Sequence, residues 1–227
     1  MASYLQLRSP PFGLVSIAAL AAFGVSSPAK AMSVAYQGSF GIMSWNQPSM
    51  SQYVLNYSVT SWLAPAIEAF SLRGERGNRQ LYIPQIGILL KRWNQTSSQA
   101  NIYINAGYGV DHHDFPGAKL SGVLNTELQV DWESRQYYLD AELQAVRLVR
   151  SDPYDFVRLR AGFAPYLAGF EGLQSWLIVQ AEHNTAVAIG PAPWTFTPFI
   201  RMIYQNVLWE VGASTQGEIN FNFMIHL

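Results

Sequence analysis

The chain has 227 residues, a formal net charge of −1, no cysteine, 13% charged residues and 14% aromatic residues. A typical soluble domain carries about 25% charged residues, so much of this protein's surface must face something other than water. The near-neutral charge provides no basic field to bind nucleic acid, and a sequence without cysteine can form neither disulfides nor thiolate metal sites.

Residues 1–31 have the three parts of a cleaved secretory signal. Arg8 is the charged residue of the n-region, an apolar run extends from Phe12 to Val25, and Ala29-Lys30-Ala31 is an A-x-A cleavage site. The alternative, a membrane anchor, needs about 18 or more apolar residues, and this run is shorter. We therefore predict cleavage after the A-x-A site and a mature domain over residues 32–227, which has 12 basic and 15 acidic residues and a net charge of −3.

The mature domain alternates between apolar and polar residues with a period of two, the pattern of a strand with one apolar face. About twelve segments show it, each near the roughly 9–11 residues that a tilted membrane strand needs. Ten strands remain possible if two weak segments are not strands. The segments are residues 35–46, 51–60, 64–74, 81–92, 101–111, 120–132, 136–148, 156–165, 175–183, 195–204, 207–215 and 218–227.

Three of these segments do not alternate cleanly. Glycines interrupt 35–46, and 175–183 is apolar on both faces. In 64–74, Glu68 and Arg73 fall on opposite faces, so one of them lands on the apolar face unless a β-bulge intervenes.

Alternation alone does not distinguish a membrane barrel from a soluble barrel, which has the same pattern with the apolar face inside. The low charge and the position of tryptophans near segment ends favour a membrane, because these rings prefer the headgroup region. The alternative is a periplasmic β protein. The sequence thus predicts an all-β fold, a closed antiparallel transmembrane β-barrel. The tryptophans are Trp45, Trp62, Trp93, Trp132, Trp194 and Trp209.

The last predicted strand, Glu218 to Leu227, alternates to its final residue and resembles the closing strand of bacterial outer-membrane β-barrels. Over residues 32–227 the chain resembles, at the level of the class, small Gram-negative outer-membrane β-barrel proteins of uncharacterised families. Lys91-Arg92-Trp93-Asn94 is one segment that looks like theirs. The resemblance implies a place in the outer membrane, contact with its lipid bilayer, and recognition of Glu218 to Leu227 by the barrel-assembly machinery.

If the apolar faces meet lipid, the charged faces line the lumen. The turn at Glu133-Ser134 predicts that Glu127 and Asp140 are cross-strand neighbours, and their repulsion would draw arginines toward them. Acids outnumber arginines in this set, which favours cations. The predicted lumen residues are Glu127, Asp131, Asp140, Glu142, Arg158, Arg160, Glu182, Arg201 and Glu210.

Asp111-His112-His113-Asp114 lies at the end of a predicted strand and has ligand types that suit zinc, copper or nickel. Adjacent strand residues point to opposite faces, so at most two of the four converge without a turn. Asp111, His112 and His113 are the candidate metal ligands, and a solvated loop is the alternative.

These features favour a narrow passive channel for ions or small solutes, because rings of charged side chains select ions in pores. One alternative is a structural or metal-associated cell-envelope barrel whose lumen is plugged by salt bridges. A second is a barrel-embedded hydrolase. The local motif of the outer-membrane phospholipase is absent. Omptin-type proteases use an aspartate pair together with an aspartate–histidine pair. Asp111 with His113 resembles the second pair, but no D-x-D aspartate pair lies near another outer rim. We expect no catalytic constellation and no cofactor.

Overall fold

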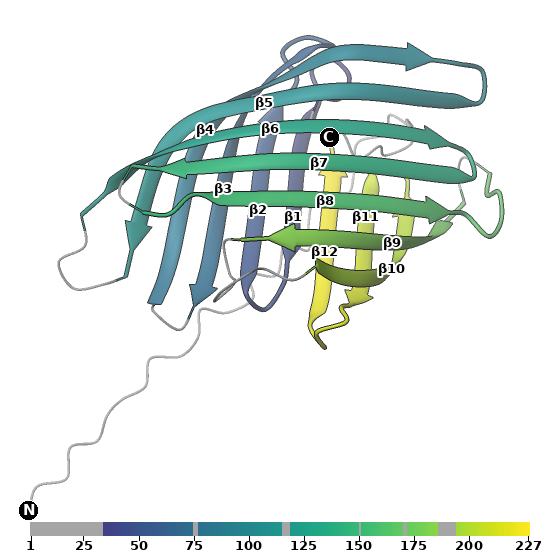
Figure 1. Cartoon of the computed structure of the whole chain (residues 1–227). Coiled ribbons are helices and arrows are strands. Elements are labelled where there is room, and N and C mark those ends of the chain that lie inside the picture. The colour runs from purple at the N-terminus through teal and green to yellow at the C-terminus, as the bar shows by residue number, and fades with distance from the viewer. Residues whose placement is uncertain (1–33, 75–76, 115–118, 150, 170–171, 186–193) are drawn as a thin grey trace, which may run out of the picture.

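The computed structural model describes residues 34–74, 77–114, 119–149, 151–169, 172–185 and 194–227. In these residues twelve antiparallel strands form one closed barrel, in which each strand pairs with its neighbours in sequence and β12 closes the ring on β1 (Figure 1). The strands are β1 (Phe40–Asn46), β2 (Met50–Tyr57), β3 (Leu63–Gly74), β4 (Gly77–Asn94), β5 (Ser98–His113), β6 (Ser121–Ser134), β7 (Tyr137–Leu148), β8 (Tyr154–Phe163), β9 (Gln174–Asn184), β10 (Trp194–Tyr204), β11 (Val207–Ala213) and β12 (Ile219–His226).

The predicted fold class and the strand count of twelve are confirmed, since each predicted segment overlaps one observed strand. No helix in the described ranges is long and apolar enough to cross a membrane. The predicted signal, residues 1–31, lies outside the described residues. We call the end of the barrel that holds Phe40 and His226 the terminal rim, and the opposite end the distal rim.

Strand length varies around the ring. β4 has 18 residues and β5 has 16, whereas β1 has 7 and β12 has 8. In Figure 1 the nearer strands β5 to β9 run across the farther strands β1, β2, β11 and β12. The strands of opposite walls therefore cross, as the tilt of strands in a barrel requires, and strands that are not neighbours in the sheet face one another across its interior.

The first strand starts later than predicted. β1 begins at Phe40, and the preceding residues fold into the terminal rim, where Val34 is fully buried beside Ala64 and Tyr103. The backbone N–H of Ala35 donates to the Ser58 hydroxyl at 3.1 Å. Residues 34–35 therefore belong to the interior of the barrel and not to its wall.

The ambiguity in β3 is resolved without a bulge. β3 pairs in continuous register with β2 and β4, and Glu68 points inward and is fully buried. Arg73 lies at the exposed end of the strand, where its guanidinium donates to the carbonyls of Gln47 and Pro48 at 3.0 and 3.1 Å. The shift of register occurs instead between β4 and β5, at Leu89/Lys91.

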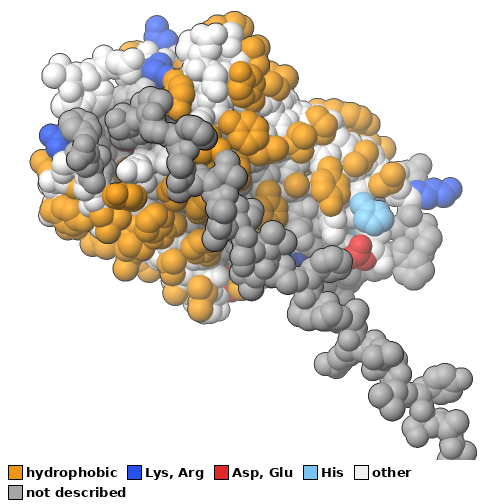
Figure 2. All heavy atoms as spheres, turned by 180° about the vertical axis from the view of Figure 1, so that it is seen from behind, with side chains coloured by type: hydrophobic (Ala, Val, Ile, Leu, Met, Phe, Trp, Pro, Cys, Tyr) orange, Lys and Arg blue, Asp and Glu red, His pale blue; other side chains and the backbone are white. Residues whose placement is uncertain are grey.

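The outer face of the barrel is apolar and its inner face holds the charges. Leu128, Ile86 and Val211 are 38%, 44% and 46% exposed, whereas Glu68 and Arg158 are buried. Figure 2 shows apolar side chains over the broad side, with charged groups mostly near the ends. A soluble protein has the opposite distribution, so this surface suits hydrocarbon.

Exposed aromatic side chains lie near both rims. Trp62, Trp93 and Trp132 lie near the terminal rim, and Tyr108 and Trp194 lie near the distal rim. Aromatic rings collect at the two membrane interfaces of β-barrels. The rings thus bracket the apolar band that would face lipid.

One part of the interior was not predicted. Apolar side chains fill the distal half between β2 to β4 and β6 to β8, and the rings of Phe70 and Phe156 stack with centroids 6.0 Å apart. We call this set the apolar layer. It closes one side of the barrel near the distal rim, and its members are Met50, Phe70, Leu72, Leu81, Ile83, Val123, Val146, Tyr154 and Phe156.

The apolar outer face and the charged inner face predict different losses of stability when an arginine is placed at two adjacent positions in the middle of β6. Leu128 is exposed on the outer face and Gln129 points inward, where it donates to Asp140. We expect Leu128→Arg to cost about 2–4 kcal/mol of folding free energy, because the guanidinium would enter the hydrocarbon. Gln129→Arg should cost much less, since acids surround it. Urea titration of folding into lipid vesicles measures both, and equal costs would contradict the assigned faces.

Candidate functional site

The polar interior begins next to the apolar layer, on the side of the terminal rim. On four strands that meet across the barrel, the inward residue in the apolar layer is followed two positions toward the terminal rim by a polar one. Further along, inward residues line a central cavity. On these four strands the interior is thus layered along the barrel axis. The pairs are Met50 and Gln52 on β2, Phe70 and Glu68 on β3, Val123 and Asn125 on β6, and Val146 and Gln144 on β7.

Arg158 of β8 lies between two glutamates on its flanking strands. Its Nη1 donates to Glu142 of β7 at 3.0 Å and its Nε donates to Glu182 of β9 at 3.1 Å. The strand register puts both glutamates directly opposite Arg158. All three are buried. Ion pairs this deep hold their geometry, because breaking one leaves an uncompensated buried charge.

Glu210 of β11 has the reverse arrangement, one glutamate between two arginines. It accepts from Nη2 of Arg160 at 2.6 Å, from Nε of Arg201 at 2.5 Å and from Asn222 at 2.7 Å. The Arg201 guanidinium also lies 4.3 Å from the centre of the Tyr138 ring, in range of a cation–π contact. Together with the Arg158 group, three arginines are matched by three glutamates.

Four further acids in the interior are held by carboxamides. An amide donates hydrogen bonds but carries no positive charge, so these contacts do not neutralise the carboxylates. The interior therefore has an excess of negative charge. The bonds are Asn105 to Glu127 (3.0 Å), Asn101 to Asp131 (2.7 Å), Gln129 to Asp140 (2.9 Å), and Gln52, Asn125 and Gln144 to Glu68 (2.6, 2.6 and 3.1 Å).

All nine predicted lumen residues point into the interior, and eight of them are buried, with Glu127 half-buried. The predicted pairing of Glu127 with Asp140 is wrong. Asp140 lies opposite Asp131, and Glu127 lies opposite Gln144. The reason is the turn, which is two residues later than predicted: the Ser134 hydroxyl accepts the N–H groups of Gln136 and Tyr137 at 3.2 and 2.8 Å and fixes the turn there.

Glu68 is an interior residue that the alternation pattern did not predict. The conflict between Glu68 and Arg73 hid it, since either could have been the one on the wrong face. The position of Arg73 beside a turn was the available signal, because a charged residue at a strand end reaches solvent from either face.

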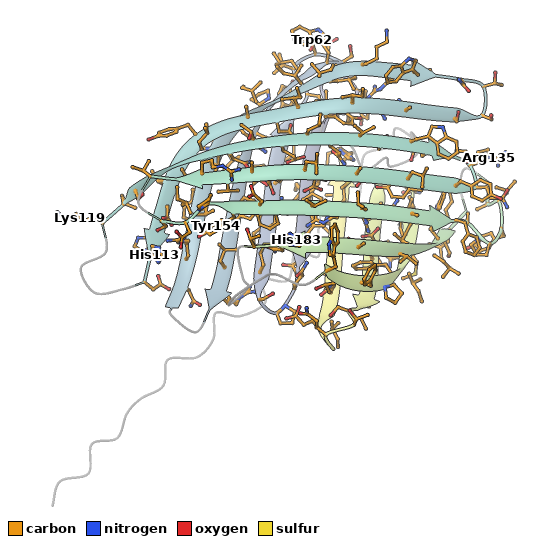
Figure 3. The ribbon with its side chains drawn as sticks, in the orientation of Figure 1. Trp62, His113, Lys119, Arg135, Tyr154 and His183 are labelled. Atoms are coloured by element: carbon orange, nitrogen blue, oxygen red, sulfur yellow. The ribbon has the colours of Figure 1, made fainter. Side chains whose placement is uncertain are left out.

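The candidate metal ligands separate onto two faces. Asp111 is buried and lies 3.2 Å from Nε of Arg79 and 3.9 Å from His113, whereas His112 points outward and pairs with Asp114 at 3.8 Å. Arg79 also contacts the Tyr154 hydroxyl, and Figure 3 shows His113 and Tyr154 near the same end of the barrel. The described residues contain no group of three or more histidines, aspartates or glutamates arranged to hold a metal ion.

Three cavities lie along the described interior. A distal cavity of about 100 Å³ is lined by Glu182, a central cavity of about 60 Å³ by Arg158 and Glu127, and a terminal cavity of about 340 Å³ by Trp176. The Arg158–Glu182 ion pair lies between the first two. Tyr138 lines the central cavity and packs in one cluster with Trp176, so these rings lie between the second and third.

No protein-family model and no curated protein matches the sequence. Among solved structures, the chain is similar to OccK8 (OprE) of Pseudomonas aeruginosa, with a TM-score of 0.42 and 8% identity over 78% of this chain and 57% of that one. It is also similar to OmpT, an outer membrane protein of Vibrio cholerae, with a TM-score of 0.34 and 8% identity over 83% of this chain and 95% of that one. A loop L8 deletion mutant of that OmpT is similar with a TM-score of 0.35 and 9% identity, over 84% of this chain and 97% of that one. The chain spans 57% of the length of OccK8.

The closed antiparallel sheet, the apolar outer face and the charged interior define a transmembrane β-barrel. The burial of the side chains on each strand distinguishes the two faces of the sheet.

Glu210 gives a stability prediction for the interior. Glu210→Gln leaves Arg160 and Arg201 buried without a counter-charge, which we expect to cost about 3–5 kcal/mol. The matched control is Asp155→Asn, which breaks the Arg147–Asp155 pair at the surface, where the side chains are 48% and 52% exposed. That pair should contribute less than about 1 kcal/mol. Urea unfolding in vesicles compares the two, and a small loss for Glu210→Gln would contradict the assigned role of the ion pairs.

Proposed function

We propose that the protein is an outer-membrane β-barrel of a Gram-negative envelope whose interior is a narrow passive channel that favours small cations. The apolar outer band and the predicted signal support the location. β12 (Ile219–His226) supports assembly in that membrane, since it closes the ring on β1. Recognition of Glu218 to Leu227 by the barrel-assembly machinery is part of this proposal.

The observation that carries the channel proposal is the negative charge along the cavities. Glu127 and Asp140 line the central cavity and take their hydrogen bonds from amides, while the arginines there are engaged by glutamates. A cation on the axis would be attracted by these carboxylates, and an anion would be repelled.

The size of the cavities limits what passes. A volume of about 60 Å³ holds a few water molecules, so the passage is narrow at rest. Movement of ions through it requires the Arg158–Glu182 pair and the Tyr138 and Trp176 rings to shift. We therefore expect low conductance and exclusion of solutes much larger than a hydrated ion.

A second candidate, a structural barrel with a plugged lumen, is favoured by the apolar layer near the distal rim and by Val34 inside the terminal rim. Both fill space that a wide pore would leave open. The two candidates differ in whether current flows through the purified protein.

Planar-bilayer recording separates them. For the wild type we expect small conductance steps with potassium preferred over chloride. Trp176→Ala should enlarge the steps, because it removes a ring between the central and terminal cavities. Glu127→Gln should reduce the preference for potassium, and Asp155→Asn at the exposed surface should change neither quantity. If neither the wild type nor Trp176→Ala gives steps, the channel proposal fails and the plugged barrel stands.

A further inference from the structure

Glu68 of β3 lies in a group of side chains that the lumen set does not include. Its carboxylate is fully buried and accepts from Gln52 Nε2 and Gln144 Nε2 at Oε1, at 2.6 and 3.1 Å, and from Asn125 Nδ2 at Oε2, at 2.6 Å. The donors come from β2, β7 and β6, so two of the bonds cross the interior. We call Glu68, Gln52, Asn125 and Gln144 the carboxamide cage.

The amides of the cage have a fixed orientation. Each turns its nitrogen to the carboxylate, because the reverse orientation would put two acceptor oxygens against each other. Their carbonyl oxygens, Gln52 Oε1, Asn125 Oδ1 and Gln144 Oε1, are buried and accept no hydrogen bond from the described protein groups. Buried acceptors are nearly always paired in proteins, either with protein groups or with water, so these three oxygens next to the Glu68 contacts are available to a ligand.

Glu68 also has no ion-pair partner. The acids in the ion pairs of the described interior are Asp111, Glu142, Glu182 and Glu210, and Glu68 is in none of these pairs. Arg158 is already held between Glu142 and Glu182. Because a buried charge without an ion-pair partner is costly, the cage favours one added positive charge.

We propose that the carboxamide cage binds one monovalent metal cation, Na⁺ or K⁺. A single carboxylate matches a single positive charge, and carbonyl oxygens are ligands that replace the hydration shell of these ions in proteins. The apolar layer covers the cage on the distal side, and Gln52 and Gln85 line the central cavity on the other. The cation enters from that cavity. This site does not depend on the proposed channel, since binding requires no passage across the barrel.

Thermal unfolding of the full chain in detergent micelles tests the site. NaCl or KCl is titrated against choline chloride at constant ionic strength and pH 8, and unfolding is followed by circular dichroism. The wild type should show a saturable rise in Tm with NaCl or KCl. Glu68→Gln, which removes the charge and keeps the shape, should show none, and Asp155→Asn, which removes an exposed acid outside the cage, should respond as the wild type does.

Asn125→Leu provides a second variant that keeps the charge and removes one carbonyl ligand. We expect its half-saturating salt concentration to rise roughly tenfold, the effect of losing one buried polar partner. If Glu68→Gln does not fold, the wild type and Asn125→Leu still decide the question.

Three outcomes would overturn the proposal. One is a wild-type response to NaCl and KCl no larger than the response to choline. Another is an equal response in Glu68→Gln. The third is stabilisation only by lower pH or only by CaCl₂, which would assign the cage to a proton or to a divalent ion. A negative bilayer recording together with a saturable Tm response would reject the channel and retain the site.

Discussion

The structure depends on one constraint. Because hydrocarbon lies outside the sheet, the charged side chains of the membrane-spanning strands must be paired or hydrogen-bonded inside the barrel. Arg158 between Glu142 and Glu182, and Glu210 between Arg160 and Arg201, satisfy that constraint with buried ion pairs. The pairs join β7 to β11 through their inner faces. Because either partner alone would be strongly unfavourable, the network ties the arrangement of β7 to β11 to the placement of their charges.

Contact between two walls of the barrel decides how the rest of the interior is used. Inward residues of β2 to β4 pack against inward residues of β6 to β8, so they meet each other and not water. Phe70 can then stack on Phe156, and Glu68, two residues away, is reached by Asn125 and Gln144 from across the barrel. The same contact between walls thus produces the apolar layer and the carboxamide cage, and it leaves the more open space beside β9 to β12.

The strands and their faces could be predicted from the sequence, because apolar and polar residues alternate along a strand that has lipid on one side. The inward position of Glu142 and Arg158 followed directly. What alternation cannot give is the contact between distant strands, so the inward apolar residues such as Val146 could not be foreseen. Nor could the partner of Asp140, since a turn centre two residues later changes every pairing along β6 and β7 without changing any face.

The uneven strand lengths have a mechanical consequence. β1 and β12, with 7 and 8 residues, meet at the junction of the chain's two ends, whereas β4 and β5, with 18 and 16, form the longest ladder. A short antiparallel ladder unzips more easily than a long one, because fewer backbone bonds hold it. The circumference is therefore weakest where its ladders are short, from β10 through β12 to β2, so we expect thermal breathing to concentrate there while β4 and β5 stay rigid.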